Sequence, residues 1–408
     1  MKKTLLIIAL LATSYLLFGS FDFFPENPCN IADRNYSHID FPGLTYEMNI
    51  DNSILQLDDI NMFQDGHFLT EAEKETLSKG DFDVNFNYKA TLLDFGHKNW
   101  NFALKSMAFV DVELLDKTYS ELAMYGNDTN IHYSSHTGEG SEAFSFWKAT
   151  FNYAYPHGLS LGMIPGLFQA DSTSAFGEYL RDMTLYFGAN INFNYSMLYT
   201  TIDESIQNFG STNDTLYYYY KAHFKYTDEH SVGRLTPSLG FGMKARIFEG
   251  YLHVSIDDLF MQLNYKNLTG GWYEKRYTNY LDYLQEGYKA FQETIIEDDS
   301  TRVKNRYVKI KPSVIVGMEY TFFRKLNVMA KYINERYSYK NGFSFGAGYQ
   351  LACIPMQAVM GYDENIFYEF KTGLIFNGFE WMLGGTFYHG FFRYGRGIGL
   401  NSMIRFKF

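Results

Sequence analysis

The sequence predicts an all-β protein, a transmembrane antiparallel β-barrel of about 14 strands, with about 16 as the alternative count. It also predicts an N-terminal plug segment and long extracellular loops. One observation is that Asn85–Tyr88 and Asn192–Tyr195 both read Asn-Phe-Asn-Tyr, an amide alternating with an aromatic ring. Another is that aromatic residues make up 19% of the chain, with 35 Tyr and 38 Phe. Such a content exceeds the needs of a core and is typical of barrels with aromatic girdles at the lipid headgroups.

The alternation has period two, which is the period of a β-strand. In the second copy, Phe193 and Tyr195 fall on one parity while Asn192 and Asn194 fall on the other. Successive strand side chains point to opposite faces, so the strand has one apolar and one amide-lined face. A half-buried soluble sheet and a barrel with lipid outside and water inside both require this pattern. Length favours the barrel, because soluble strands usually have about five or six residues. We therefore expect rings to face lipid and amides the lumen, with Arg tolerated at Asn194 but not at Phe193.

Two segments depart from the strand pattern. Residues 68–79 contain Thr70 followed by Glu73, a capping-box pattern that predicts a helix start,. Residues 274–297 place apolar side chains at helical spacing, and we expect them to form part of a long extracellular loop,. The expected strands are residues 43–50, 82–94, 99–110, 142–155, 158–168, 184–201, 216–227, 235–248, 250–264, 306–321, 325–336, 342–352, 366–376, 378–389 and 397–408.

The N-terminal segment has the pattern of an export signal. Two lysines precede an apolar run from Leu5 to Phe18, and small residues follow it. The run is shorter than the roughly 20 residues that span a bilayer. We expect a signal peptide at residues 1–20, a plug at 21–42 and the barrel at 43–408.

The C-terminal segment alternates and ends on the aromatic Phe408. It resembles the terminal strand by which the assembly machinery of bacterial outer membranes recognises barrels. We therefore expect a Gram-negative outer-membrane location, with membrane lipid and the barrel assembly machinery as partners.

Several kinds of chemistry are disfavoured. The net charge of -11 argues against a nucleic-acid partner,. Two Gly-x-Ser-x-Gly matches, at 158–162 and 342–346, lie inside alternating strands, whereas a hydrolase serine needs a sharp strand-to-helix turn,. His132 and His136 lie in a Ser- and Gly-rich stretch that we interpret as a loop and not as a metal site. We expect no enzymatic activity, no cofactor and no metal. Cys29 and Cys353 lie far apart, and whether they pair stays open.

A family resemblance is carried by short motifs near the start of the expected mature chain. These are Asn27-Pro28-Cys29-Asn30-Ile31-Ala32, residues 39–43 and 52–55, and later residues 92–96 and 122–127. They resemble a family of uncharacterised outer-membrane barrels, common in Bacteroidota-type bacteria, within the FadL/PorV-like group. Members often carry Asn-Pro-Ala where this chain has Asn-Pro-Cys.

The resemblance implies one of two roles. In FadL-like transporters the N-terminal segment is a hatch that plugs the barrel, which would make Asn27, Pro28, Cys29, Asn30 and Ile31 hatch residues in a porin-like channel for small hydrophobic molecules. In PorV-like members the barrel instead serves protein secretion or surface anchoring, with a secreted protein as partner. A channel would need an apolar pocket beside the hatch and a side opening where a strand kinks. Pro312 is a candidate for the kink because proline interrupts a strand's hydrogen bonds.

Overall fold

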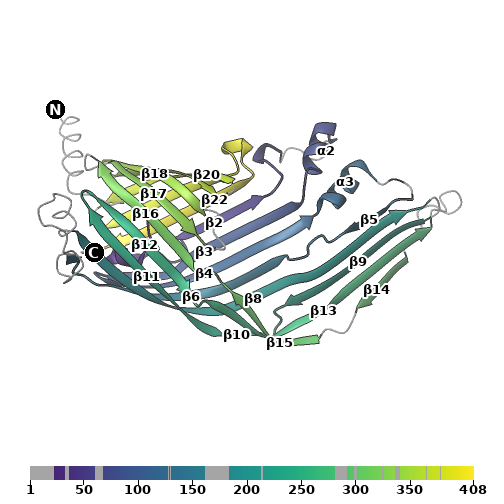
Figure 1. Ribbon diagram of the computed structural model, residues 1–408, viewed down its shortest axis with the longest axis horizontal. Helices are drawn as coiled ribbons and strands as arrows, with labels where there is room; N and C mark the ends of the chain where they lie inside the picture. Colours follow the sequence, from purple (N-terminus) through teal and green to yellow (C-terminus); the bar gives the residue numbers. More distant parts are fainter. Residues whose placement is uncertain are drawn as a thin grey trace, which may run out of the picture.

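The protein is a closed antiparallel β-barrel in which the wall strands follow chain order (Figure 1). The computed structural model describes residues 23–32, 36–59, 68–126, 128, 130–160, 183–212, 215–280, 292–297, 301–322, 326–335, 341–363, 365–376 and 378–408. The expected signal peptide, residues 1–20, lies outside these residues. No helix among them is long or apolar enough to cross a membrane.

Fourteen strand positions form the wall, which confirms the predicted count. The first position is shared by β1 and β2, and both pair with β22, so the sheet closes on itself and has no free edge at the seam. The wall strands are β1 (Ser37–Asp40), β2 (Tyr46–Asn52), β3 (Phe82–His97), β4 (Trp100–Leu115), β6 (Glu142–Ala154), β8 (Thr184–Ser211), β11 (Leu235–Ile247), β12 (Gly250–Leu259), β16 (Ser313–Phe322), β17 (Leu326–Asn334), β18 (Gly342–Leu351), β19 (Ile354–Asp363), β20 (Asn365–Phe376), β21 (Phe379–Tyr388) and β22 (Gly397–Lys407).

One end of the barrel carries the tight turns and the C-terminus. Two-residue connections at 98–99, 248–249, 352–353 and 377–378 join successive strands there. Each contains a residue with positive φ, as tight hairpins require,. In outer-membrane barrels the short turns face the periplasm and the longer connections face outward. This closed barrel accordingly lies in the bacterial outer membrane,.

On one side of the barrel the sheet continues past the wall at the outward end (Figure 1). The second half of β8 pairs with β9, β9 pairs with β13, and β13 pairs with β14 and β15. We call these strand segments the extracellular arm. Its strands are β9 (Thr215–Tyr226), β13 (Gln262–Tyr280), β14 (Gln292–Glu297) and β15 (Thr301–Lys309), and two short strands pair beside them, β5 (His132–Ser135) with β8 and β10 (Val232–Gly233) with β13. The two-residue β7 (Leu159–Ser160) pairs with the start of β8, at the opposite end of the barrel.

The helices are short, and none of them forms part of the barrel wall. The capping box predicted at Thr70 is present at the start of α2 (Glu71–Leu77). The others are α3 (Lys117–Tyr125), η1 (Pro28–Ile31) and η4 (Phe392–Tyr394).

The predicted parity is confirmed at the second Asn-Phe-Asn-Tyr copy. The side chains of Asn192 and Asn194 are fully buried on the lumen side, whereas Phe193 is 44% and Tyr195 40% exposed on the outer face. In the first copy Asn87 is likewise buried. The Asn194 amide donates to Ser238 Oγ at 3.1 Å, so this position is packed and not open to water. Because of this packing, we no longer expect Arg to be tolerated at Asn194.

Three expected element boundaries differ from the structure. The wall begins at Ser37 and not at residue 43, because residues 37–40 pair with both β3 and β22. Residues 274–280 and 292–297 are strands and not loop or helix, because β13 pairs with β9 and β14 along their length. Strand β19 was not predicted: Pro355, at its second position, argued against a strand, although the strand's two faces alternate in polarity,.

We predict that Phe193→Arg destabilises the barrel by up to about 2–4 kcal/mol, the cost of a cation on the lipid face near the midplane. Asn152→Arg is the matched control, because Asn152 lines the luminal cavity and its new charge reaches water. Urea unfolding of the purified proteins in lipid vesicles measures both. Equal destabilisation by the two variants would contradict the assignment of outer and inner faces.

Candidate functional site: a plugged luminal cavity

The N-terminal segment 23–32, which we call the plug, lies inside the barrel. Its centre is the 3-10 turn η1, where proline occupies a first-turn position and the Asn27 side chain accepts from the Cys29 amide at 3.0 Å. Asn27, Pro28, Cys29 and Ile31 are buried, and Asn30 is partly buried. The five residues singled out in the sequence therefore form one compact turn within the lumen.

Glycines in the wall make room for this turn. Gly188 of β8 and Gly242 of β11 are direct cross-strand partners, so together they leave a bare patch of backbone. A Cβ at Gly188 would lie 2.6 Å from the Pro28 carbonyl carbon, and one at Gly242 would overlap Asn27 Oδ1. A side chain at either position is incompatible with the plug as it is seated.

A second glycine contact lies further round the wall. A Cβ at Gly317 of β16 would lie 2.7 Å from Phe24 Cε1. The Phe24 ring stacks on His253 of β12, with centroids 4.1 Å apart and planes 9° apart. His253 Nδ1 lies 3.4 Å from the Asn27 amide nitrogen, so one wall side chain holds two plug residues.

The start of the plug is anchored by one hydrogen bond and by apolar contacts. The Lys331 ammonium donates to the Phe23 carbonyl at 3.2 Å. Phe23 and Phe24 pack with inward side chains from β16, β17, β19, β20 and β21, so the plug crosses the lumen from this side to β6 and β8. These wall residues are Ile315, Met329, Ile333, Val359, Phe367 and Tyr388.

The two cysteines do not pair. Cys29 is fully buried in the plug and its thiol donates to the Tyr186 carbonyl at 3.4 Å. Cys353 lies in the turn between β18 and β19, and neither cysteine is in a disulfide. Cys29 is therefore a reporter of whether the plug is seated.

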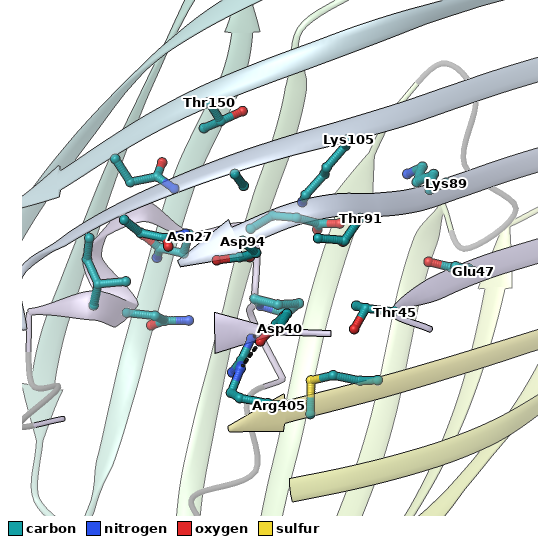
Figure 2. Close-up of a pocket in the computed structure, with 18 of the residues that line it drawn as sticks. Asn27, Asp40, Thr45, Glu47, Lys89, Thr91, Asp94, Lys105, Thr150 and Arg405 are labelled. Atoms are coloured by element: carbon teal, nitrogen blue, oxygen red, sulfur yellow. Dashed lines mark hydrogen bonds and ion pairs between the residues drawn. The ribbon is translucent and has the colours of Figure 1, made fainter. Parts of the chain in front are cut away.

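A cavity of about 650 Å³ lies against the plug and is lined by side chains from most of the wall (Figure 2). Its lining mixes charged groups with apolar ones such as Met107 and Ile315. At its periplasmic side Arg405 of β22 forms a two-point ion pair with Asp40 of β1, at 2.5 and 3.0 Å. This pair joins the first and last wall strands across the seam.

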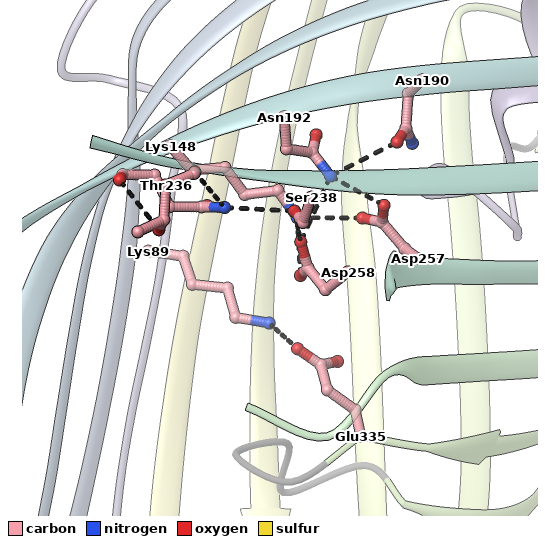
Figure 3. Close-up of polar contacts among 10 residues, drawn as sticks. Lys89, Lys148, Asn190, Asn192, Thr236, Ser238, Asp257, Asp258 and Glu335 are labelled. Atoms are coloured by element: carbon pink, nitrogen blue, oxygen red, sulfur yellow. Dashed lines mark hydrogen bonds and ion pairs between the residues drawn. The ribbon is translucent and has the colours of Figure 1, made fainter. Parts of the chain in front are cut away.

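Charged side chains facing the cavity are paired across the lumen and between strands (Figure 3). Lys148 of β6 contacts Asp257 at 2.9 Å and Asp258 at 2.7 Å, both at the end of β12. The Asn192 amide donates to the same two carboxylates, at 3.0 and 3.2 Å. Lys89 of β3 reaches across to Glu335 at 3.1 Å. These contacts couple strands that are not neighbours in the sheet.

At three adjacent positions around the sheet, the strand is interrupted between the barrel wall and the extracellular arm. The breaks fall at residues 227–231, 260–261 and 310–312, and Pro312 lies in the third. Asp258 and Phe260 have positive φ, which turns the chain between β12 and β13.

A side-chain contact bridges the first of these breaks. The Thr269 hydroxyl donates to Asp228 at 2.5 Å. With further bonds from the His230 amide and the Ser231 hydroxyl, it lowers the pKa of that carboxyl to about 2.

An apolar cluster lies on the extracellular side of the cavity, beside these breaks. Inward side chains of β4, β6 and β8 pack there against β13 and β15, so these strands lean together above the cavity. The members are Met107, Phe109, Phe144, Phe146, Tyr199, Met261, Leu263, Tyr265, Leu268 and Val308.

Other singled-out residues lie away from the cavity. His132 is in β5, where its ring lies against Tyr217, and His136 contacts the Ser205 carbonyl at 2.8 Å. Ser344 lies within β18 and not at a strand-to-helix turn.

Sequence reasoning missed the wall glycines and the ion pairs. Nothing in the sequence distinguishes Gly188 and Gly242 from other glycines. Their importance follows from their pairing across β8 and β11, which leaves a bare patch of backbone. The sequence signal that could have indicated the ion pairs was the presence of lysines at strand positions that point to the lumen.

Several solved structures align with most of this chain. The Pseudomonas putida toluene transporter TodX aligns at 8% identity over 96% of this chain and 94% of that chain, with a TM-score of 0.41. The Ralstonia pickettii toluene transporter TbuX aligns at 10% identity over 94% and 92%, with a TM-score of 0.44. A Pseudomonas aeruginosa FadL homologue aligns at 10% over 94% and 91%, with a TM-score of 0.36. No protein-family model and no curated protein sequence matches the chain. Similarity at this level assigns the chain to no family.

We predict that Gly242→Ala loosens the plug. The added methyl overpacks Asn27 and Pro28, a cost of about 1–3 kcal/mol, which raises the unseated population by about fivefold to a hundredfold. In a Cys353→Ser background, the rate of maleimide labelling of Cys29 should rise by that factor. Gly385→Ala is the matched control, because its new Cβ has nothing nearer than 3.9 Å. Equal labelling of both variants would show that Gly242 does not seat the plug.

We predict that Lys148→Met destabilises the barrel by about 3–5 kcal/mol, because it removes a buried cation from two half-buried carboxylates,. Lys74→Met, on the exposed face of α2, removes a pair with Glu71 and should cost less than about 0.5 kcal/mol. Adding Asp257→Asn and Asp258→Asn to Lys148→Met should recover part of the loss. Urea unfolding tests this, and no difference between Lys148→Met and Lys74→Met would refute it.

Proposed function

We propose that this protein is an outer-membrane channel for small hydrophobic molecules and that the plug is its gate. The observation that carries the proposal is that residues 23–32 cross the lumen beside a cavity of about 650 Å³. A cavity of this size is in the range that holds a small ligand. The plug is held by one stacked ring, glycine-sized notches and a few hydrogen bonds, with no covalent link between Cys29 and Cys353. A segment held in this way can leave without the wall unfolding.

Apolar groups on both sides of the cavity support a hydrophobic cargo. One set surrounds Phe23 and Phe24 of the plug, and the other lies at the base of the extracellular arm. Displacing the plug would expose the first set to the cavity. The interruption of the wall at Pro312 adjoins the second set and is where a side opening would form.

The hatch role of Asn27, Pro28, Cys29, Asn30 and Ile31 is part of this proposal. Asn27 is central to it, because its side chain caps η1 and its amide lies against His253. The division into a signal peptide, a plug and a wall belongs to the same proposal, with the wall taken from Ser37.

We predict that entry of an apolar probe depends on the plug. Intact Gram-negative cells producing the wild type should take up N-phenylnaphthylamine faster than cells lacking the protein. Cells producing Gly242→Ala should take it up faster still, while Gly385→Ala matches the wild type. Fluorescence of the membrane-bound dye is the measurement, and lactose entry, which should not change, is the test of cargo class.

Two outcomes would revise the proposal. A rise in lactose entry equal to that of the dye would keep the gate and replace the hydrophobic cargo by a general one. Faster Cys29 labelling in Gly242→Ala with no change in either uptake would refute the channel, and the secretion or anchoring role would then be the better explanation.

A further inference from the structure

Three lysines on adjacent strands face the cavity. Lys89 lies on β3, Lys105 on β4 and Lys148 on β6, and all three line the cavity. Lys105 is directly opposite Lys148 in the register of β4 and β6. Directly opposed residues have Cβ atoms about 4.5–5.5 Å apart, and like charges in that arrangement repel.

Two of the three lysines have acidic partners, and the third has none among the residues that the structure describes. Lys89 pairs with Glu335, and Lys148 with Asp257 and Asp258. Among the residues that the structure describes, Lys105 makes no ion pair. Asp94 is near enough to act on it electrostatically, but the Asp94 carboxylate is engaged by His38 Nε2 at 3.1 Å. Lys105 thus faces the cavity from a position directly opposite another lysine.

We propose that Lys105 anchors an anion-binding site in the cavity and that its ligand is a small organic molecule with a carboxylate or phosphate group. An anionic oxygen at Lys105 replaces the missing acidic partner and offsets the repulsion from Lys148. Thr91, directly opposite Lys105 on the other neighbouring strand, lines the same part of the cavity and has a hydroxyl that can donate to the anion (Figure 2).

The remainder of the ligand has an apolar surface to lie on. Ala103 and Met107, two residues before and after Lys105, also line the cavity. The site thus combines one unpaired cation, one hydroxyl and a short apolar strip within about 650 Å³. This inference concerns occupancy of the cavity and does not rest on passage through the barrel.

Calorimetric titration of the purified, folded protein with benzoate and with phenyl phosphate tests the site. We expect saturable binding of one anion per chain. Lys105→Gln should weaken it about tenfold or more, because a charge-assisted bond is lost. Lys105→Arg should retain most of the affinity. Lys98→Gln, in an exposed periplasmic turn, is the control for general charge effects and should bind like the wild type.

Benzyl alcohol, a neutral molecule of the same shape as benzoate, separates an anion site from an apolar one. Binding of benzyl alcohol as tight as that of benzoate, or equal benzoate affinity in Lys105→Gln and wild type, would overturn the proposal. Urea unfolding checks that the variant folds. Lys105→Gln should be at least as stable as the wild type because a like-charge contact is gone, and a loss as large as that of Lys148→Met would identify Lys105 as a structural ion-pair partner instead.

Discussion

The pairing of the first and last wall strands is the constraint on which the rest of this structure depends. In lipid there is no water to satisfy a free strand edge, so a sheet must close to span the membrane. Here β22 pairs with β1 and β2, and the two-point contact of Arg405 with Asp40 ties the same strands together inside the lumen. A barrel of fourteen strands is wider than barrels whose interior is filled by the side chains of the wall alone. The plug and the long paired side chains occupy that interior.

Much of the fold was predictable from the sequence because strand parity is a local property. Phe193 and Asn194 differ in polarity so clearly that their faces could be assigned from the letters alone. Strand β19 shows the limit: Pro355 at its second position argued against a strand, and its ladders with β18 and β20 define it. Residues 274–280 show the opposite error, since helical spacing of aromatics was outweighed by pairing with β9.

The site was less predictable because it depends on register. The turn at Asn27 was singled out through a resemblance, but its seat at Gly188 and Gly242 exists only because those two residues face each other. The same holds for Lys105 and Lys148, which are 43 positions apart in sequence and directly opposed in the wall. A one-residue slip of either strand would turn these side chains to lipid. Register therefore fixes both the shape and the charge of the cavity.

The interruption at residues 227–231, 260–261 and 310–312 has a mechanical meaning. Continuous hydrogen-bond ladders make a sheet stiff along its strands, and three adjacent lines lose that continuity at one level. The compliance of the sheet is therefore concentrated there. We therefore expect a force applied to the far tip of the extracellular arm to bend the molecule at this level.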